Sequence, residues 1–178
     1  MLRHWRLFFG QLAKESLKQL NMPDLKGETP LMLMAEAADT ELVRIMLQAG
    51  ADPEIQDWQG MTALHSACKS CVDSCVDVLL DQPCKLDKLT NEGRSPLHTA
   101  SWAGNVHAVK RLLQLAPEMA WKRDSFGKTP LELAEHLIEH PDVLKGVAER
   151  RAQDGKCCAS KQELEVIVQL LEVVAPAH

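Results

Sequence analysis

Aromatic residues are scarce in this sequence. Its 178 residues include four Trp, three Phe and no Tyr, which together make 4% of the chain. The strands of β-sandwiches and barrels usually draw on these residue types, so the shortage argues against an all-β protein. It also leaves few side chains that could stack on nucleic-acid bases.

Glycine, proline and long apolar runs are also limited. Nine Gly and nine Pro are too few for a collagen-like or low-complexity chain. No stretch reaches about 18 uninterrupted apolar residues, the length that a membrane-spanning helix needs. The formal net charge of −5 disfavours binding to duplex nucleic acid and favours a basic protein partner. We therefore expect a monomer that binds a protein, and neither nucleic acid nor a membrane.

Catalytic motifs are missing as well. We find no Gly-x-Ser-x-Gly, no phosphate-binding glycine loop and no dinucleotide fingerprint. His136 and His140 are one helical turn apart, as in a metal pair, but no Glu stands beside the first His as the metalloprotease motif requires. We interpret this stretch as the solvated face of a helix, and we expect no enzymatic activity, cofactor or metal.

The start of the chain and its six cysteines bear on the cellular compartment. The first residues lack the apolar run and the small-residue cleavage site of a secretory signal. Adjacent Cys157 and Cys158 are a poor disulfide pair, so we expect a reducing compartment, the cytoplasm or nucleus. Residues 1–23 are amphipathic and carry four basic residues against the single acid Glu15, which leaves a mitochondrial presequence as the alternative.

A repeat with a period of 33 to 34 residues organises the sequence. Its glycines stand at positions 27, 60, 93 and 127, in the segments Gly-Glu-Thr-Pro-Leu, Gly-Met-Thr-Ala-Leu, Gly-Arg-Ser-Pro-Leu and Gly-Lys-Thr-Pro-Leu. Three residues before each glycine come Asp24, Asp57, Thr90 and Asp124. Self-similarity at such a period is the signature of an array of stacked units.

Each copy of the repeat predicts a pair of helices. Thr29, Thr62, Ser95 and Thr129 are good N-caps, and proline follows three of them at the first helical position. Farther on, apolar residues recur at helical spacing in a second helix, as in Val43, Met46 and Leu47. Because each pair leaves apolar surface uncovered, neighbouring pairs must stack.

These motifs resemble those of the ankyrin-repeat family, whose signature is Thr-Pro-Leu-His-x-Ala. The resemblance includes Leu64-His65-Ser66-Ala67, Leu97-His98-Thr99-Ala100 and the ending Gly50-Ala51-Asp52. It covers residues 24 to about 124 cleanly, and continues to 174 with a disrupted last unit. It implies an all-α solenoid of about four helix-turn-helix units with finger-like turns, in which His65 and His98 are structural.

The register of the repeat divides the chain into units. We expect a capping helix in residues 1–23, repeats at 24–56, 57–89 and 90–123, and a fourth repeat at 124–178. In the fourth repeat, Ile167, Leu170 and Leu171 continue the apolar pattern about 24 residues late. We therefore place an insertion at about 139–162 and a C-terminal capping helix after it. The alternative makes residues 142–151 the second helix and 161–174 an extra cap.

One cluster of residues suggests a different class of function. His65, Cys68, Cys71 and Cys75 are zinc-type ligands at close spacing. However, each also fills a repeat position and matches His98, Ser101, Gly104 or Ala108 one unit later, so packing explains them. A metal or redox sensor centred on Cys68, Cys71 and Cys75 stays as the alternative function.

The resemblance implies that the finger turns and the exposed side of each first helix form a concave surface for a partner. We therefore expect a non-enzymatic protein–protein interaction module, either an adaptor, an assembly chaperone or an inhibitor. Trp58 and Trp102 are the strongest candidates because Trp often dominates interfaces, although Trp102 could instead pack on its own helix pair. The expected binding positions are Leu25, Lys26, Glu28, Trp58, Gln59, Met61, Lys69, Asn91, Glu92, Arg94, Trp102, Ser125, Phe126, Lys128 and His136.

Overall fold

The computed structural model describes residues 19–70, 72–82, 84–145 and 160–174. Most of the expected N-terminal cap and of the insertion, as well as Cys71, therefore lie outside the described residues. No strand occurs in the described ranges, and none of their helices is long and apolar enough to cross a membrane. The elements are α2 (Pro30–Glu36), α3 (Thr40–Gln48), α4 (Ala63–Ser70), α5 (Asp73–Leu80), α6 (Pro96–Ala103), α7 (Val106–Leu115), η1 (Pro117–Trp121), α8 (Pro130–Glu139) and α10 (Lys161–Val174).

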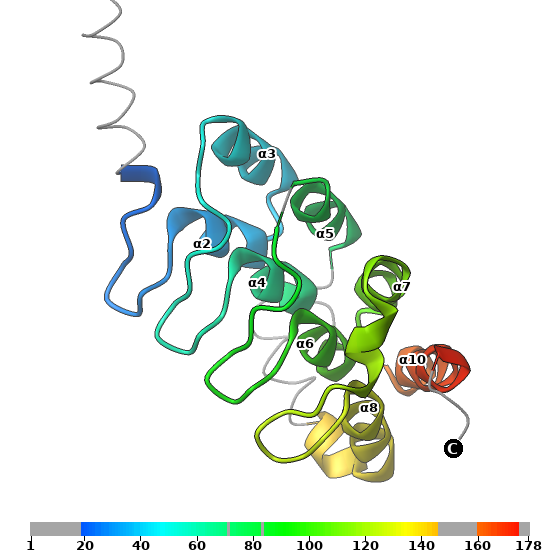
Figure 1. Cartoon of the computed structure of the whole chain (residues 1–178). Helices are drawn as coiled ribbons and strands as arrows, with labels where there is room; N and C mark the ends of the chain where they lie inside the picture. The colour runs from blue at the N-terminus through cyan, green and yellow to red at the C-terminus, as the bar shows by residue number, and fades with distance from the viewer. Residues whose placement is uncertain (1–18, 71, 83, 146–159, 175–178) are drawn as a thin grey trace, which may run out of the picture.

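The helices form two layers (Figure 1). The first helices of the units, α2, α4, α6 and α8, pack side by side in one layer. The second helices, α3, α5, α7 and α10, pack in the same order in the other layer. Between successive units the chain extends beyond the first-helix layer as finger-like turns (Figure 1). The predicted all-α repeat solenoid is therefore confirmed.

Capping residues fix the start of the first helices. The hydroxyls of Thr29, Ser95 and Thr129 each accept a hydrogen bond from the backbone amide three residues on. The side chain of that third residue accepts in return from the amide of the cap, which completes a capping box. These contacts are local, and they satisfy amides that would otherwise lack a partner in the first helical turn.

Small residues let the helices approach each other closely. Ala35, Ala67 and Ala100, at equivalent positions of α2, α4 and α6, are fully buried. The valines that begin the apolar pattern of the second helices are fully buried too. A single hydrophobic core follows from this packing and runs from Leu31 in α2 to Leu171 in α10.

Helix α10 completes the fourth unit. It buries Leu164, Ile167 and Leu171, and it packs against α8, α7 and η1. In the preceding unit, α7 packs in the same way against α6 and α5. Residues 141–145 are also helical, but most of them are exposed. These contacts favour α10 over residues 142–151 as the second helix of the fourth unit, and we propose that assignment.

The fingers are built alike and are joined edge to edge. In three of them an aspartate, Asp24, Asp57 or Asp124, accepts two backbone amides with one carboxylate oxygen at 2.8–2.9 Å. Thr90 takes this place in the third finger, where its hydroxyl accepts from the Arg94 amide at 3.2 Å. Adjacent fingers are linked by backbone hydrogen bonds from Trp58 to Lys26 (3.2 Å), from Asn91 to Gln59 (2.8 Å) and from Ser125 to Glu92 (2.9 Å).

Glycine is required where the fingers touch. Gly60 has a φ of +78°, and a Cβ atom at this position would lie 2.8 Å from the backbone nitrogen of Asn91 in the next finger. Gly127 has a similar φ of +76°, but a Cβ atom there would meet nothing within 4 Å. The two positions therefore differ in finger-to-finger contact and share the same backbone conformation.

This pair gives a matched test of stacking. We expect Gly127→Ala to lower the free energy of unfolding by about 1–2 kcal/mol, the cost of a left-handed backbone at a residue with a Cβ atom. Gly60→Ala should lower it by roughly 1–3 kcal/mol more, because the third finger must also shift. Urea denaturation followed by circular dichroism measures both changes. Equal losses in the two variants would show that the contact between fingers contributes nothing to stability.

Candidate partner-binding surface

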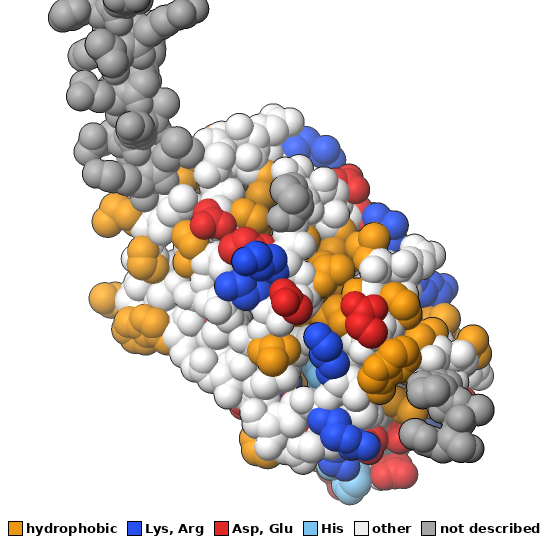
Figure 2. Space-filling model, in the orientation of Figure 1, with side chains coloured by type: hydrophobic (Ala, Val, Ile, Leu, Met, Phe, Trp, Pro, Cys, Tyr) orange, Lys and Arg blue, Asp and Glu red, His pale blue; other side chains and the backbone are white. Residues whose placement is uncertain are grey.

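Large apolar side chains project from three of the four fingers. Leu25, Trp58 and Phe126 are 89%, 72% and 69% exposed, whereas the third finger presents Asn91 and Glu92. Figure 2 shows apolar side chains along the edge of the molecule that the fingers form. Exposed aromatic and aliphatic side chains grouped in this way are typical of an interaction surface.

A groove of about 350 Å³ lies between the first and second units. The Trp58 ring stands at this junction, because a Cβ atom on Gly27 of the first finger would lie 2.7 Å from its Cδ1 atom. An ion pair of 3.2 Å between Lys69 Nζ in α4 and Glu36 Oε1 in α2 joins the two helices that border the groove. The lining comprises Lys26, Glu28, Glu36, Asp57, Trp58, Gln59, Met61, Ser66 and Lys69.

Six of those lining residues were expected from the sequence, and three were missed. Glu36 could have been predicted from the period of the repeat, because it stands 33 residues before Lys69, which was among the expected binding positions. Ser66 precedes Thr99 by the same interval, but neither residue differs enough from a structural serine or threonine to stand out. Asp57 was noted only as a recurring position of the repeat, and in the structure its carboxylate accepts two backbone amides of its own finger.

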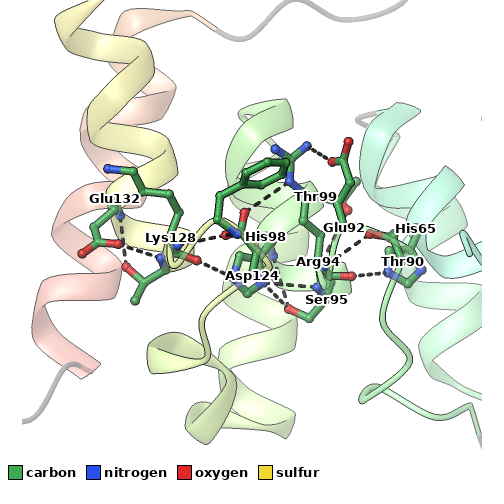
Figure 3. Close-up of polar contacts among 12 residues, drawn as sticks. His65, Thr90, Glu92, Arg94, Ser95, His98, Thr99, Asp124, Lys128 and Glu132 are labelled. Atoms are coloured by element: carbon green, nitrogen blue, oxygen red, sulfur yellow. Dashed lines mark hydrogen bonds and ion pairs between the residues drawn. The ribbon is translucent and has the colours of Figure 1, made fainter. Parts of the chain in front are cut away.

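Arg94 is the centre of a second group of predicted residues, at the third and fourth fingers. Its guanidinium is 2.9 Å from a carboxylate oxygen of Glu92 and 3.5 Å from one of Asp124 (Figure 3). Its Cζ atom also lies 5.7 Å from the centre of the Trp102 ring. Trp102 is half-buried and packs against the core. Part of its surface is therefore used for packing on the helices, which was the alternative to partner binding. These contacts hold the Arg94 side chain in one place.

Asp124 is the buried acidic residue of this group. Its side chain is buried, and burial by itself raises the pKa of the carboxyl. Hydrogen bonds from the backbone amides of Lys128 and Phe126 and from the Arg94 guanidinium lower the pKa by more than burial raises it. The pKa of Asp124 therefore lies below its usual value. Asp124 is therefore a charged partner that orients Arg94 and shapes the fourth finger.

The remaining predicted residues lie on the fingers and on α8. Asn91 donates a hydrogen bond from Nδ2 to the Trp58 carbonyl at 2.7 Å, and so ties the second finger to the third. Ser125 and Lys128 are exposed on the fourth finger. His136 is half-buried on α8, and its ring stacks on that of His140 with 4.2 Å between ring centres.

His65 and His98 link each first helix to the next finger (Figure 3). In each ring Nδ1 accepts a hydrogen bond of 3.2 Å from the amide of the capping residue, Thr62 or Ser95. The other ring nitrogen, Nε2, lies 3.2 Å from the Arg94 carbonyl in His65 and 3.1 Å from the Lys128 carbonyl in His98. A carbonyl can only accept and an amide N–H can only donate, so both rings are neutral with the proton on Nε2.

Burial explains why these rings stay neutral. It lowers the pKa of His65 from 6.5 to about 4, and it lowers that of His98 as well. The expectation that both histidines are structural is confirmed. Because both nitrogens of His65 are occupied, its ring is not free to bind a metal ion.

Two of the cysteines have packing roles. Cys68 and Cys75 are fully buried, and burial raises the pKa of the Cys75 thiol, which disfavours the reactive thiolate. Within the described ranges no group of three or more His, Cys, Asp or Glu side chains could hold a metal ion. The described residues thus lend no support to a sensor at Cys68, Cys71 and Cys75.

Comparison with known families agrees with this architecture. The family model described as ankyrin repeats (3 copies) matches residues 7–88 and 71–156, well over half of the chain. The protein belongs to the ankyrin-repeat family. Its fingers and paired helices are therefore repeats of a kind found in many proteins, arranged here as a short array.

Several ankyrin-repeat proteins are similar in sequence. Mouse B-cell lymphoma 3 protein homolog is 31% identical over 72% of this chain and 29% of its own length. Human NF-kappa-B inhibitor alpha is 34% identical over 60% of this chain and 36% of its own length. Bovine SMC5-SMC6 complex localization factor protein 1 is 35% identical over 61% of this chain and 11% of its own length. The chain thus spans well under half of each relative, and the similarity points to protein–protein interaction in general.

The buried imidazoles make stability depend on pH. We expect the free energy of unfolding to fall as the pH decreases from about 6.5 to about 4, because the unfolded chain then takes up protons that folded His65 does not. The full shift of His65 corresponds to at most about 3 kcal/mol. Urea denaturation at a series of pH values measures the slope.

A substitution identifies the source of the slope. His65→Gln should be less stable than the wild type near neutral pH, but its stability should depend less steeply on pH in this range, by about one proton. His140→Gln is the control, since this ring is exposed at the end of α8. An unchanged slope in His65→Gln would mean that His65 is not the titrating group.

Proposed function

We propose that this ankyrin-repeat protein is a non-enzymatic interaction module that binds a partner protein with its fingers and first helices. The observation that carries the proposal is the exposure of Leu25, Trp58 and Phe126 on a row of fingers held together by backbone hydrogen bonds. The groove beside Trp58 adds a recess into which a side chain of the partner can enter. A backbone that is already fixed by hydrogen bonds loses little further conformational entropy on binding.

The names of the relatives support this class of function. One is called an inhibitor of NF-kappa-B and another a localization factor of the SMC5-SMC6 complex, so each is named for an effect on other proteins. We extend to this chain only the general role of an adaptor, assembly chaperone or inhibitor. We place this role in the cytoplasm or nucleus.

Charge on the surface indicates the chemistry of the partner. Around the groove, Glu28, Glu36 and Asp57 outnumber Lys26 and Lys69, and the whole chain has a net charge of −5. We propose a partner that is basic overall and presents apolar side chains to the finger tips. Complementary charge would speed association, while the apolar contacts would supply most of the affinity.

Trp58 provides the sharpest test of the surface. Trp58→Ala should reduce partner binding by about 30-fold, because truncation of a central interface Trp often costs about 2 kcal/mol. The matched control is Trp121→Ala, which removes an exposed Trp of η1 in the connection to the fourth finger. Quantitative mass spectrometry of proteins captured by the wild type and the two variants measures the effect.

The expected result is at least one protein that the wild type and Trp121→Ala retain and Trp58→Ala loses. Circular dichroism and thermal melting should stay close to those of the wild type in both variants, because Trp58 is 72% and Trp121 46% exposed. Equal recovery of every captured protein by Trp58→Ala and the wild type would show that the proposed surface is wrong.

A further inference from the structure

The array contains an internal example of how the junction between two units holds an arginine. Between the third and fourth units, the Arg94 guanidinium lies 2.9 Å from a carboxylate oxygen of Glu92 and 3.5 Å from one of the buried Asp124 (Figure 3). Its Cζ atom is 5.7 Å from the centre of the Trp102 ring. The cation is thus set among carboxylates and an aromatic ring, and both kinds of contact favour a guanidinium.

The period of the repeat identifies the residues that occupy the same places at the other junctions. Two of these places are one and nine residues after the finger glycine of one unit, and the third is three residues before the finger glycine of the next unit. All three hold an acid at the first junction, whereas none does at the second. The residues are Glu28, Glu36 and Asp57 at the first junction, Met61, Lys69 and Thr90 at the second, and Arg94, Trp102 and Asp124 at the third.

Asp57 binds its own finger in the same way as Asp124. In both residues one oxygen, Oδ1, accepts two backbone amides at 2.8–2.9 Å. The other oxygen of Asp124 faces the Arg94 guanidinium. Among the described residues, by contrast, no Lys, Arg or His forms an ion pair with Asp57. Asp57 therefore keeps one oxygen that can accept from a cation of the partner.

The charges around the groove leave a place for one more cation. Glu28, Glu36 and Asp57 line it together with Lys26 and Lys69, so that three acids face two lysines. Lys69 Nζ is 3.2 Å from Glu36. Glu28 is paired more loosely, since Lys26 Nζ lies 3.9 Å from it on a side chain that is 80% exposed. An incoming arginine would balance the charge of this group.

Trp58 supplies the aromatic face that Trp102 supplies at the third junction. Its ring is 72% exposed and lines the same groove of about 350 Å³. A guanidinium can stack on an indole while its fork of N–H donors reaches carboxylates beside it. A lysine ammonium has no planar face and fewer donors, so the arrangement favours arginine over lysine.

We propose that this groove receives one arginine side chain of the partner, with the guanidinium between the Trp58 ring and the carboxylates of Glu28 and Asp57. The partner's arginine then fills the place that Arg94 fills at the third junction. The inference rests on the proposed function, because it assigns the chemistry of the partner at one part of the same binding surface.

Random dodecapeptides displayed on phage provide the probe. They are selected on the full chain and counter-selected on Trp58→Ala, and we expect the retained peptides to share an arginine. In a synthetic peptide of selected sequence, citrulline in place of that arginine removes the charge and should raise Kd at least about tenfold. Lysine in its place should raise Kd by less, because it keeps the charge and loses the planar fork. Fluorescence anisotropy of the labelled peptides measures Kd.

Variants of Glu28 link this effect to the groove. Glu28→Gln should raise the Kd of the arginine peptide about tenfold and leave that of the citrulline peptide nearly unchanged. Glu28→Arg places a guanidinium of the chain itself where the third unit has Arg94, and it should abolish binding of the arginine peptide. Glu118→Gln, at an exposed glutamate of η1, is the control and should bind as the wild type does. Circular dichroism checks the fold of each variant.

The possible results separate this inference from the proposed function. If no selected peptide depends on Trp58, the proposed partner-binding surface is wrong, and so is the arginine site within it. If peptides depend on Trp58 but bind equally well with citrulline or to Glu28→Gln, the surface stands and the arginine site is overturned. Selected peptides that share Asp or Glu instead would assign the groove to Lys26 and Lys69, and they would also overturn it.

Discussion

Burial between neighbouring units is the constraint on which the rest of this structure depends. A pair of short helices such as α4 and α5 cannot cover its own apolar surface, and it does so only against α2 and α3 on one side and α6 and α7 on the other. Ala67 and Val76 are consequently fully buried although no helix of their unit exceeds eight residues. The fingers inherit their alignment from this stacking and add backbone hydrogen bonds to it.

The same constraint separates structural positions from variable ones. Alanines recur where neighbouring helices approach closely, and capping residues recur because they accept amides of the first helical turn. Finger glycines recur because each has a left-handed backbone conformation. One position, by contrast, holds Glu36, Lys69, Trp102 and His136 in successive units, on the side of the first helices that borders the groove. One geometric place thus carries a carboxylate, an ammonium, an indole and an imidazole. In such an array, the side chains that stacking does not dictate are the ones free to serve recognition.

What could be predicted from the sequence follows this division. The caps and the roles of His65 and His98 depend on residues three apart or on the repeat itself, and both were predictable. The ion pair of Glu36 with Lys69 was not, because it requires knowing that α2 and α4 lie side by side with these positions opposed. Trp102 was ambiguous for a similar reason: how much of its ring is covered depends on Arg94, which reaches it from a finger.

The units are not joined equally, and the difference coincides with the groove. His65 and His98 each carry an Nε2 proton that reaches the next finger, but the first unit has Met32 at this position. A thioether can accept the Thr29 amide, as Met32 does at 3.5 Å, yet it has no proton to offer the second finger. The first and second fingers are therefore held by fewer polar contacts than the second and third. The groove lies at this junction, where fewer polar contacts hold the neighbouring side chains in place.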